Sequence, residues 1–223
     1  MSAPRCILFD CDGVLVDSEV IACRVDAGVL AAAGYPVTEA DIRERFVGLS
    51  SASMMDVLIA ETGIQPPADL GERRRAAVMA AFETELLAIA HVGEAIATAL
   101  GAGISVGVAS SSGLPRIERA LEITGLRQFF SHHLYSASMV RHGKPAPDLF
   151  LHAANALGFA PSECVVIEDA VPGVQGGVAA GMEVIGFTGG SHCGDGHEER
   201  LKDAGASRVV RSMLELPKLL GLV

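Results

Sequence analysis

Acidic side chains follow a short apolar segment close to the start of the chain. Residues 7–9 are typical of a buried parallel strand, and Asp10, Asp12 and Gly13 come directly after it. Carboxylates at the carboxyl end of such a strand lie where open α/β sheets bind ligands. Unpaired like charges near a core do not stabilise a fold, so the pair indicates function. A plain turn, which Asp and Gly also favour, is the alternative.

Three serines follow a second apolar segment. Ser110 ends the run 104–109, and Ser111 and Ser112 lead into the pattern of a helix. Hydroxyls and free N–H groups at the start of a helix form an anion site. Simple capping of that helix is the alternative interpretation.

A second acidic pair and one lysine are further candidate functional residues. Glu168 and Asp169 end the apolar run 164–167, which repeats the arrangement at the start of the chain. Lys144 stands in a segment stiffened by Pro145 and Pro147, which suits a fixed charge that reaches inward. The alternatives are a solvated turn for the acids and an ordinary surface position for the lysine.

Together these side chains favour the chemistry of phosphate esters. Carboxylate oxygens are hard ligands that suit Mg²⁺, which keeps waters and a phosphate oxygen in its shell. Lys144 would offset both the carboxylates and an incoming anion. A carboxylate nucleophile would split hydrolysis into phosphorylation of the protein and release of phosphate.

The elements that position these groups follow a βα alternation. Short apolar runs and helical patterns alternate from about residue 92, which predicts an α/β fold with a Rossmann-like parallel sheet covered by helices. The spacing of apolar residues predicts helices over residues 19–33, 51–62 and 70–89, and Thr38 followed by Asp41 predicts the capped start of a further helix. We therefore expect a sheet domain of residues 1–15 and 92–223 with an inserted helical domain, 16–91.

Composition excludes several classes of partner. The formal net charge of −10, with 4% aromatic residues and no Trp, disfavours nucleic acid and anionic membrane surfaces. No apolar run is long enough to span a membrane, and the start lacks a signal pattern. The five cysteines form no CxxC pair and indicate reduced thiols in a cytoplasmic protein. We expect a monomer or a weak dimer.

Four motifs resemble the haloacid dehalogenase superfamily of phosphotransferases, in the order and spacing of that family. They are FDCDGVLVDSE (9–19), VASSS (108–112), GKPAPD (143–148) and VIEDA (166–170). The resemblance covers essentially the whole chain and implies that the helical insertion is the family's small cap domain.

The resemblance also implies a role for each motif residue. Asp10 would attack phosphorus and form an aspartyl phosphate, while Asp12 would protonate the leaving group and then activate water. Ser110 and Lys144 would hold the transferred phosphoryl oxygens. The metal site would take Mg²⁺, with ligands from Asp10, the backbone carbonyl of Asp12 and Asp169, and with Glu168 close by or acting through water.

Within the superfamily the chain looks like the branch of β-phosphoglucomutase and small sugar-phosphate phosphatases. Mutases of that branch carry a histidine where this chain has Ala22 and an arginine where it has Ser51. We therefore expect a phosphatase acting on a small phosphate ester, with the mutase as the alternative. The segments 17–21 and 45–48 further resemble a bacterial 6-phosphogluconate phosphatase group.

Substrate contacts are expected from the loop of serines 110–112, here called the serine loop, and from the helical insertion. For Arg45, pairing with a nearby acid on the helix surface is an equally weighted alternative to a substrate anion. The candidate residues are Ser111, Ser112, Glu19, Arg45 and Gly48.

Two other interpretations account for part of the pattern. A signalling receiver module would also gather Asp10, Ser110 and Lys144 around a phosphorylated aspartate, but it has no room for a helical insertion. His192, Cys193, Asp195 and His197 suggest zinc, yet their spacing matches no structural zinc pattern. For these four we expect a mobile exposed loop.

Overall fold

The chain divides into two compact units. The computed structural model describes residues 4–46 and 51–222. One unit, here the sheet unit, comprises Met1–Asp17 and Leu87–Val223, and the other, the helical unit, comprises Ser18–Leu86. Each unit has its own hydrophobic core.

The described part of the sheet unit is built on six parallel strands. Their order across the sheet is β3-β2-β1-β4-β5-β6, so β1 lies centrally between β2 and β4. The chain builds outward from β1 in one direction and then returns to its other side, which makes the gap between the ends of β1 and β4 the topological switch point. The strands are β1 Cys6–Phe9, β2 Ser105–Ser110, β3 Leu134–Ser136, β4 Cys164–Glu168, β5 Glu183–Phe187 and β6 Arg208–Val210.

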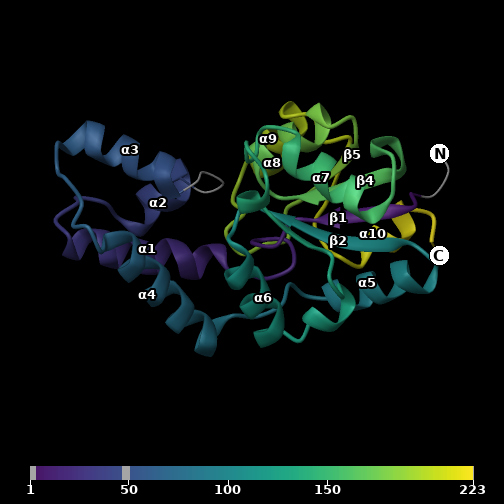
Figure 1. The fold of residues 1–223 in the computed structure, drawn as a ribbon, viewed down its shortest axis with the longest axis horizontal. Coiled ribbons are helices and arrows are strands. Elements are labelled where there is room, and N and C mark those ends of the chain that lie inside the picture. Colours follow the sequence, from purple (N-terminus) through teal and green to yellow (C-terminus); the bar gives the residue numbers. More distant parts are fainter. Residues whose placement is uncertain (1–3, 47–50, 223) are drawn as a thin grey trace. The chain divides into compact units, whose positions relative to one another are not determined.

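Helices cover both faces of this sheet. α7 packs over β1, β2 and β3, α8 over β4 and β5, and α9 over β5 and β6, while α5 packs on β2 (Figure 1). Because the sheet is buried on both faces, β1 is apolar throughout and β4 is apolar up to Glu168, without alternating polar residues. The helices are α5 Val92–Gly101, α6 Leu114–Ile123, α7 Asp148–Leu157, α8 Val171–Ala179, α9 His197–Asp203 and α10 Glu215–Leu219.

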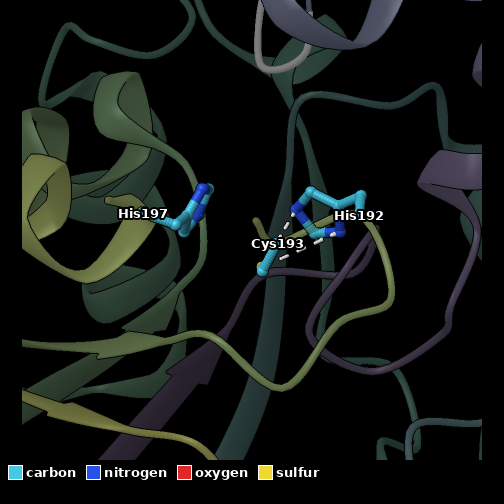
Figure 2. Close-up of side chains that lie close together, drawn as sticks. All are labelled: His192, Cys193 and His197. Atoms are coloured by element: carbon cyan, nitrogen blue, oxygen red, sulfur yellow. Dashed lines mark hydrogen bonds between the residues drawn. The ribbon is translucent and has the colours of Figure 1, made fainter. Parts of the chain in front are cut away.

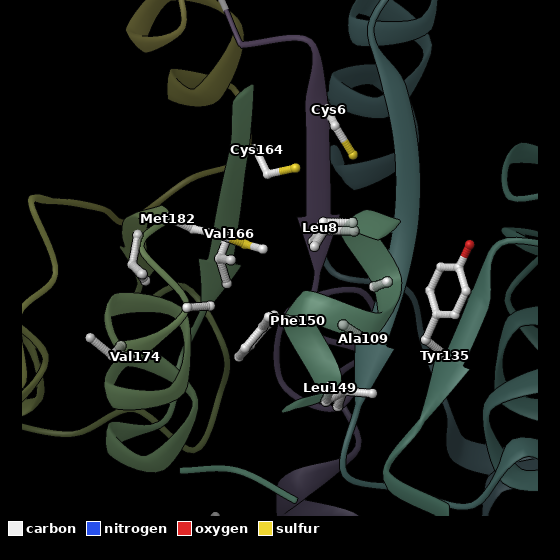
Figure 3. Close-up of a cluster of buried hydrophobic side chains, with 14 of the residues drawn as sticks. Cys6, Leu8, Ala109, Tyr135, Leu149, Phe150, Cys164, Val166, Val174 and Met182 are labelled. Carbon is white, nitrogen blue, oxygen red and sulfur yellow. The ribbon is translucent and has the colours of Figure 1, made fainter. Parts of the chain in front are cut away.

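One face of the sheet carries a continuous apolar cluster. Leu8 of β1 and Val166 of β4 belong to it, together with Leu149 and Phe150 of α7 and Val174 of α8 (Figure 3). These side chains are fully buried, and each contributes about 1.5–3 kcal/mol by leaving water. The cluster fixes α7 against the sheet, and the loop before α7 carries Lys144 to the ends of β1 and β4.

Within residues 18–46 and 51–86, the helical unit consists of α1 Glu19–Ala32, α2 Glu39–Phe46, α3 Ser51–Thr62 and α4 Leu70–Glu85. α1 packs against α2 and α4. The Arg74 guanidinium donates to both oxygens of Asp26, at 2.6 and 2.9 Å, and to Ser51 at 2.9 Å. Thr38 and Asp41 hydrogen-bond reciprocally at the start of α2, as the sequence predicts.

The predicted fold class is confirmed, with differences at individual elements. The predicted helix 70–89 ends at Glu85, because the chain then pairs with the loop after β1: Asp17 N–H donates to Leu87, and Ile89 N–H to Leu15. The sequence prediction missed α5 and the short edge strand β6. No helix within the described residues is long and apolar enough to cross a membrane.

Candidate active site

Two adjacent strands bring the acidic pairs together. Phe9 of β1 pairs with Ile167 of β4, so the residues that follow, Asp10 and Glu168, lie side by side at the switch point. The backbone N–H of Asp10 donates to the carbonyl of Ile167 at 2.9 Å. Carboxylate oxygens of Asp10, Glu168 and Asp169 all lie within 4.8 Å of one another, and all three residues are buried.

Lys144 is inserted into this acidic cluster. Its ammonium group donates to Asp10 Oδ1 and to Glu168 Oε1, both at 2.6 Å, and its side chain is only 4% exposed. Nζ also lies 5.1 Å from the centre of the Phe150 ring. The alternative of an ordinary surface lysine is therefore wrong, and so is a solvated turn for Glu168, which is 1% exposed.

The cluster contains three carboxyl groups and the ammonium group of Lys144. Burial, opposed by Lys144 and reinforced by Glu168, raises the pKa of Asp10 from 3.8 to about 7. Burial likewise raises the pKa of Glu168, and burial together with the Asp10 charge raises the pKa of Asp169 well above its usual range. Burial would lower the pKa of Lys144, but Asp10 and Glu168 outweigh it and raise that pKa. Three buried carboxylates around one ammonium form a site that favours a further cation.

Asp12 lies beside this cluster, and its carboxylate accepts hydrogen bonds from Ser112 and Arg116. Ser112 Oγ donates to Asp12 Oδ2 at 2.6 Å, and Arg116 donates to Asp12 Oδ1 at 2.7 Å. The Ser110 hydroxyl is buried and accepts from the Ser112 N–H at 3.1 Å, so it organises the serine loop instead of capping α6, which begins at Leu114.

Asp169 contacts two histidines of the segment that follows β5. His192 Nε2 lies 3.0 Å from Asp169 Oδ2, and His197 Nε2 lies 2.6 Å from the Asp169 backbone carbonyl. His192 is buried, and Ser191 beside it donates twice to Asp17, so the prediction of a mobile exposed loop is wrong for this part. Figure 2 shows His192 and Cys193 approaching His197 from the loop before α9.

Comparisons with known proteins place this geometry in a family. A family model for haloacid dehalogenase-like hydrolases matches residues 4–181. The chain belongs to this family. The resemblance predicted from the four motifs is thereby confirmed, and the chain is an enzyme of a hydrolase family.

Individual members of the haloacid dehalogenase-like family match almost the whole chain. The chain is 32% identical to the 6-phosphogluconate phosphatase of Escherichia coli over 200 residues, 89% of this chain and 87% of the relative. It is 34% identical to the hexitol phosphatase B of the same species over 190 residues, 83% and 85% of the two chains. A conserved haloacid dehalogenase-like protein from Agrobacterium tumefaciens has a TM-score of 0.85 and 38% identity, with 97% of both chains covered.

The predicted site residues fall into three groups. The sheet unit gathers Asp10, Asp12, Ser110, Ser112, Lys144, Glu168 and Asp169 at the ends of β1, β2 and β4 and in the loop before α7. Ser111, in the same loop as Ser110, has an exposed side chain. Glu19 and Arg45 belong to the helical unit, where Arg45 forms an exposed ion pair with Glu61 at 2.5 Å, the alternative that the sequence left open. Gly48 lies outside the described residues.

Sequence reasoning missed Arg116 and the two histidines as site residues. Arg116 lies in the first turn of α6, where the helix dipole disfavours a positive charge. An arginine at this unfavourable position is the one feature of the sequence that could have indicated a functional role for Arg116. His192 and His197 lie beyond the four motifs, and neither strand ends nor periodicity connect them to Asp169. Only the tertiary structure brings them there.

Proposed function

We propose that this enzyme is a Mg²⁺-dependent phosphatase of small phosphate monoesters that works through an aspartyl phosphate on Asp10. The observation that carries the proposal is the position of Asp10, a buried carboxylate at the switch point of the sheet with Lys144 at 2.6 Å and two further acids beside it. Membership of the haloacid dehalogenase-like hydrolases and the phosphatases among its relatives support the same reaction.

The residues at the switch point fit a divalent cation. Their donors are hard carboxylate oxygens, which Mg²⁺ prefers, and burial raises the pKa of all three acids because one lysine does not balance them. Asp10 and Asp169, with the backbone carbonyl of Asp12, would hold the ion, and Glu168 would lie close by. When bound, Mg²⁺ supplies charge that orients a phosphate oxygen and offsets the negative charge gathered there.

The protein's own residues account for the two half-reactions. In the first, an Asp10 oxygen forms a bond to phosphorus, the bond from phosphorus to the ester oxygen breaks, and Asp12 gives its proton to the departing alkoxide. In the second, water attacks phosphorus while Asp12 takes its proton, and the bond to Asp10 breaks to release phosphate. Lys144 and Ser110 hold the phosphoryl oxygens throughout.

Arg116 and Ser112 orient the proton carrier. Both donate to the Asp12 carboxylate, so they fix it in one rotamer beside the serine loop. A carboxylate bound in this way is ready to accept a proton from water in the second half-reaction.

The helical unit is proposed as the cap that selects the substrate. The relatives include a 6-phosphogluconate phosphatase and a hexitol phosphatase, which supports a phosphorylated sugar or sugar derivative as the substrate class. Glu19, Arg45 and Ser111 remain candidate substrate contacts. Ala22 and Ser51 stand where mutases of this branch carry a histidine and an arginine, which supports hydrolysis over a second phosphoryl transfer.

The proposal is tested by turnover. Purified protein is assayed with p-nitrophenyl phosphate and a panel of sugar phosphates that includes 6-phosphogluconate and β-glucose 1-phosphate, with Mg²⁺ or with EDTA. Phosphate release that requires Mg²⁺ and disappears in Asp10→Asn supports the phosphatase. Net formation of glucose 6-phosphate from β-glucose 1-phosphate would instead identify a mutase, and stoichiometric phosphorylation without release would identify a receiver module.

A further inference from the structure

Asp169 is held at two points by histidines that the four motifs do not include. His192 Nε2 lies 3.0 Å from the carboxylate oxygen Oδ2, and His197 Nε2 lies 2.6 Å from the backbone carbonyl of the same residue. The family match ends at residue 181, so both histidines belong to the part of the chain beyond it. We propose that His192 and His197 form a clamp that positions Asp169 as a metal ligand, an inference that rests on the proposed function.

Glycines make room for the first contact of the clamp. A Cβ atom on Gly13, where φ is +79°, would lie 1.9 Å from Asp169 Oδ2 and 2.9 Å from the His192 ring. A Cβ atom on Gly190 would lie 2.8 Å from that ring. Real Cβ atoms do not come so close, so the approach of His192 to Asp169 depends on two positions without side chains.

The loop that carries His192 is anchored on both sides of the ring. Ser191 donates to Asp17 from its backbone N–H at 3.1 Å and from its hydroxyl at 2.8 Å. The N–H of Cys193 donates to the Gly190 carbonyl at 3.0 Å. The side chains of His192 and Asp169 are 2% and 3% exposed, so water does not compete for their contact. An anchored, buried donor restricts the carboxylate to one orientation.

In the second contact, between His197 and the Asp169 carbonyl, the donor and the acceptor can be assigned. Because a backbone carbonyl only accepts, His197 Nε2 must carry the proton, and Nδ1 then accepts from the Arg200 guanidinium at 3.0 Å. Both ring nitrogens of His197 are therefore in use. The rings of His192 and His197 meet edge to face, with centroids 5.7 Å apart (Figure 2).

The same neighbourhood is a poor site for a transition metal. His192, Cys193 and His197 offer ligand atoms within 4.8 Å of one another. However, both ring nitrogens of His197 are already bonded, Nε2 to the Asp169 carbonyl and Nδ1 to the Arg200 guanidinium. The contacts to Asp169 favour a clamp that acts on the neighbouring magnesium site.

Removing a residue that hydrogen-bonds to a metal ligand usually lowers metal affinity or activity by about 10- to 100-fold. The test compares His192→Leu, which fills the space without a donor, with His192→Gln, which restores an N–H donor near the Nε2 position. Cys193→Ser is the matched control, because Cys193 lies in the same loop with Sγ 3.4 Å from His192 Nε2, and serine keeps a small polar group beside that nitrogen while His192 stays in place. Mg²⁺ affinity is measured by calorimetry without substrate, and kcat and KM for p-nitrophenyl phosphate are measured at saturating Mg²⁺.

The clamp predicts that H192L weakens Mg²⁺ binding by about 10- to 100-fold, that H192Q recovers most of the loss, and that C193S binds Mg²⁺ like the wild type. H192L should lower kcat with little change in KM. H197L and H197Q test the second contact in the same way, and they keep the test decisive where H192L is too unstable to purify.

Two results overturn the clamp and leave the phosphatase standing. One is wild-type Mg²⁺ affinity in H192L and H197L, and the other is a loss in H192Q as large as in H192L, which would assign His192 to packing alone. A wild-type protein that neither binds Mg²⁺ nor turns over p-nitrophenyl phosphate would overturn the proposed function and the clamp together, so the two failures are distinguishable.

Discussion

The replacement Asp10→Asn should stabilise the metal-free protein while it abolishes turnover. Burial raises the pKa of Asp10 from 3.8 to about 7 in the folded state, so folding favours the protonated carboxyl. The folded protein therefore retains a proton that the unfolded chain releases. The resulting loss of stability is absent below about pH 4, grows as the pH rises, and is complete above about pH 7.

The magnitude follows from that difference in pKa. One pKa unit corresponds to about 1.4 kcal/mol, so ionised Asp10 lowers the free energy of unfolding by about 4 kcal/mol at pH 7.5. At pH 5, where Asp10 is ionised in the unfolded chain but largely protonated in the folded protein, the loss of stability is about 2 kcal/mol. Asparagine has nearly the same shape as aspartate and no charge. The free energy of unfolding of D10N should therefore exceed that of the wild type by about 4 kcal/mol at pH 7.5 and about 2 kcal/mol at pH 5.

The assay is urea denaturation of wild type and D10N in EDTA at pH 5 and pH 7.5. Asp41→Asn is a control of opposite sign, because hydrogen bonds from Thr38 lower the pKa of Asp41 in the folded state. D41N should therefore destabilise the protein, and more at pH 7.5 than well below pH 4. A D10N variant that is less stable than wild type, or equally stabilised at both pH values, would refute the reasoning about the charge cluster.

Three further perturbations test other parts of the site. Lys144→Met leaves the acidic cluster without its ammonium partner and should destabilise the metal-free protein by about 3–5 kcal/mol, with partial recovery in Mg²⁺; an unchanged melting temperature in EDTA would contradict this. Gly13→Ala should lower kcat by at least about 100-fold, whereas Gly103→Ala, at the same φ of +79° but with open space around it, should affect stability alone. Arg116→Gln should lower kcat by about 10- to 100-fold with little effect on KM, and an unchanged kcat would remove Arg116 from the positioning of Asp12.

The core of the site could be predicted from the sequence because of the topology of parallel sheets. Short apolar runs identify strands, and the strands of a parallel sheet all end at the same edge, so the polar residues after each run meet there. Asp10 follows β1 and Glu168 ends β4, and the register of these two adjacent strands places them side by side. The inward position of Lys144 was a weaker inference, since one lysine between prolines is compatible with a surface loop.

The remaining features depend on contacts that no local pattern encodes. α4 ends at Glu85 because the chain then hydrogen-bonds to Leu15 and Asp17, which are seventy residues distant in the sequence. The sequence predicts an exposed loop around His192, yet the two bonds from Ser191 to Asp17 and the contact with Asp169 hold His192 in a buried position, beside Gly190. Glycine there serves the close approach of the ring rather than mobility.

The central claim is that Asp10 becomes phosphorylated during turnover. The direct measurement is to quench the enzyme in acid during hydrolysis of its best substrate, reduce it with labelled borohydride, and map the labelled peptide. An aspartyl phosphate is reduced to homoserine, so the account predicts label at position 10, dependent on substrate and absent from D10N. Rapid turnover with no label at position 10, or with label at another acidic residue, would contradict it.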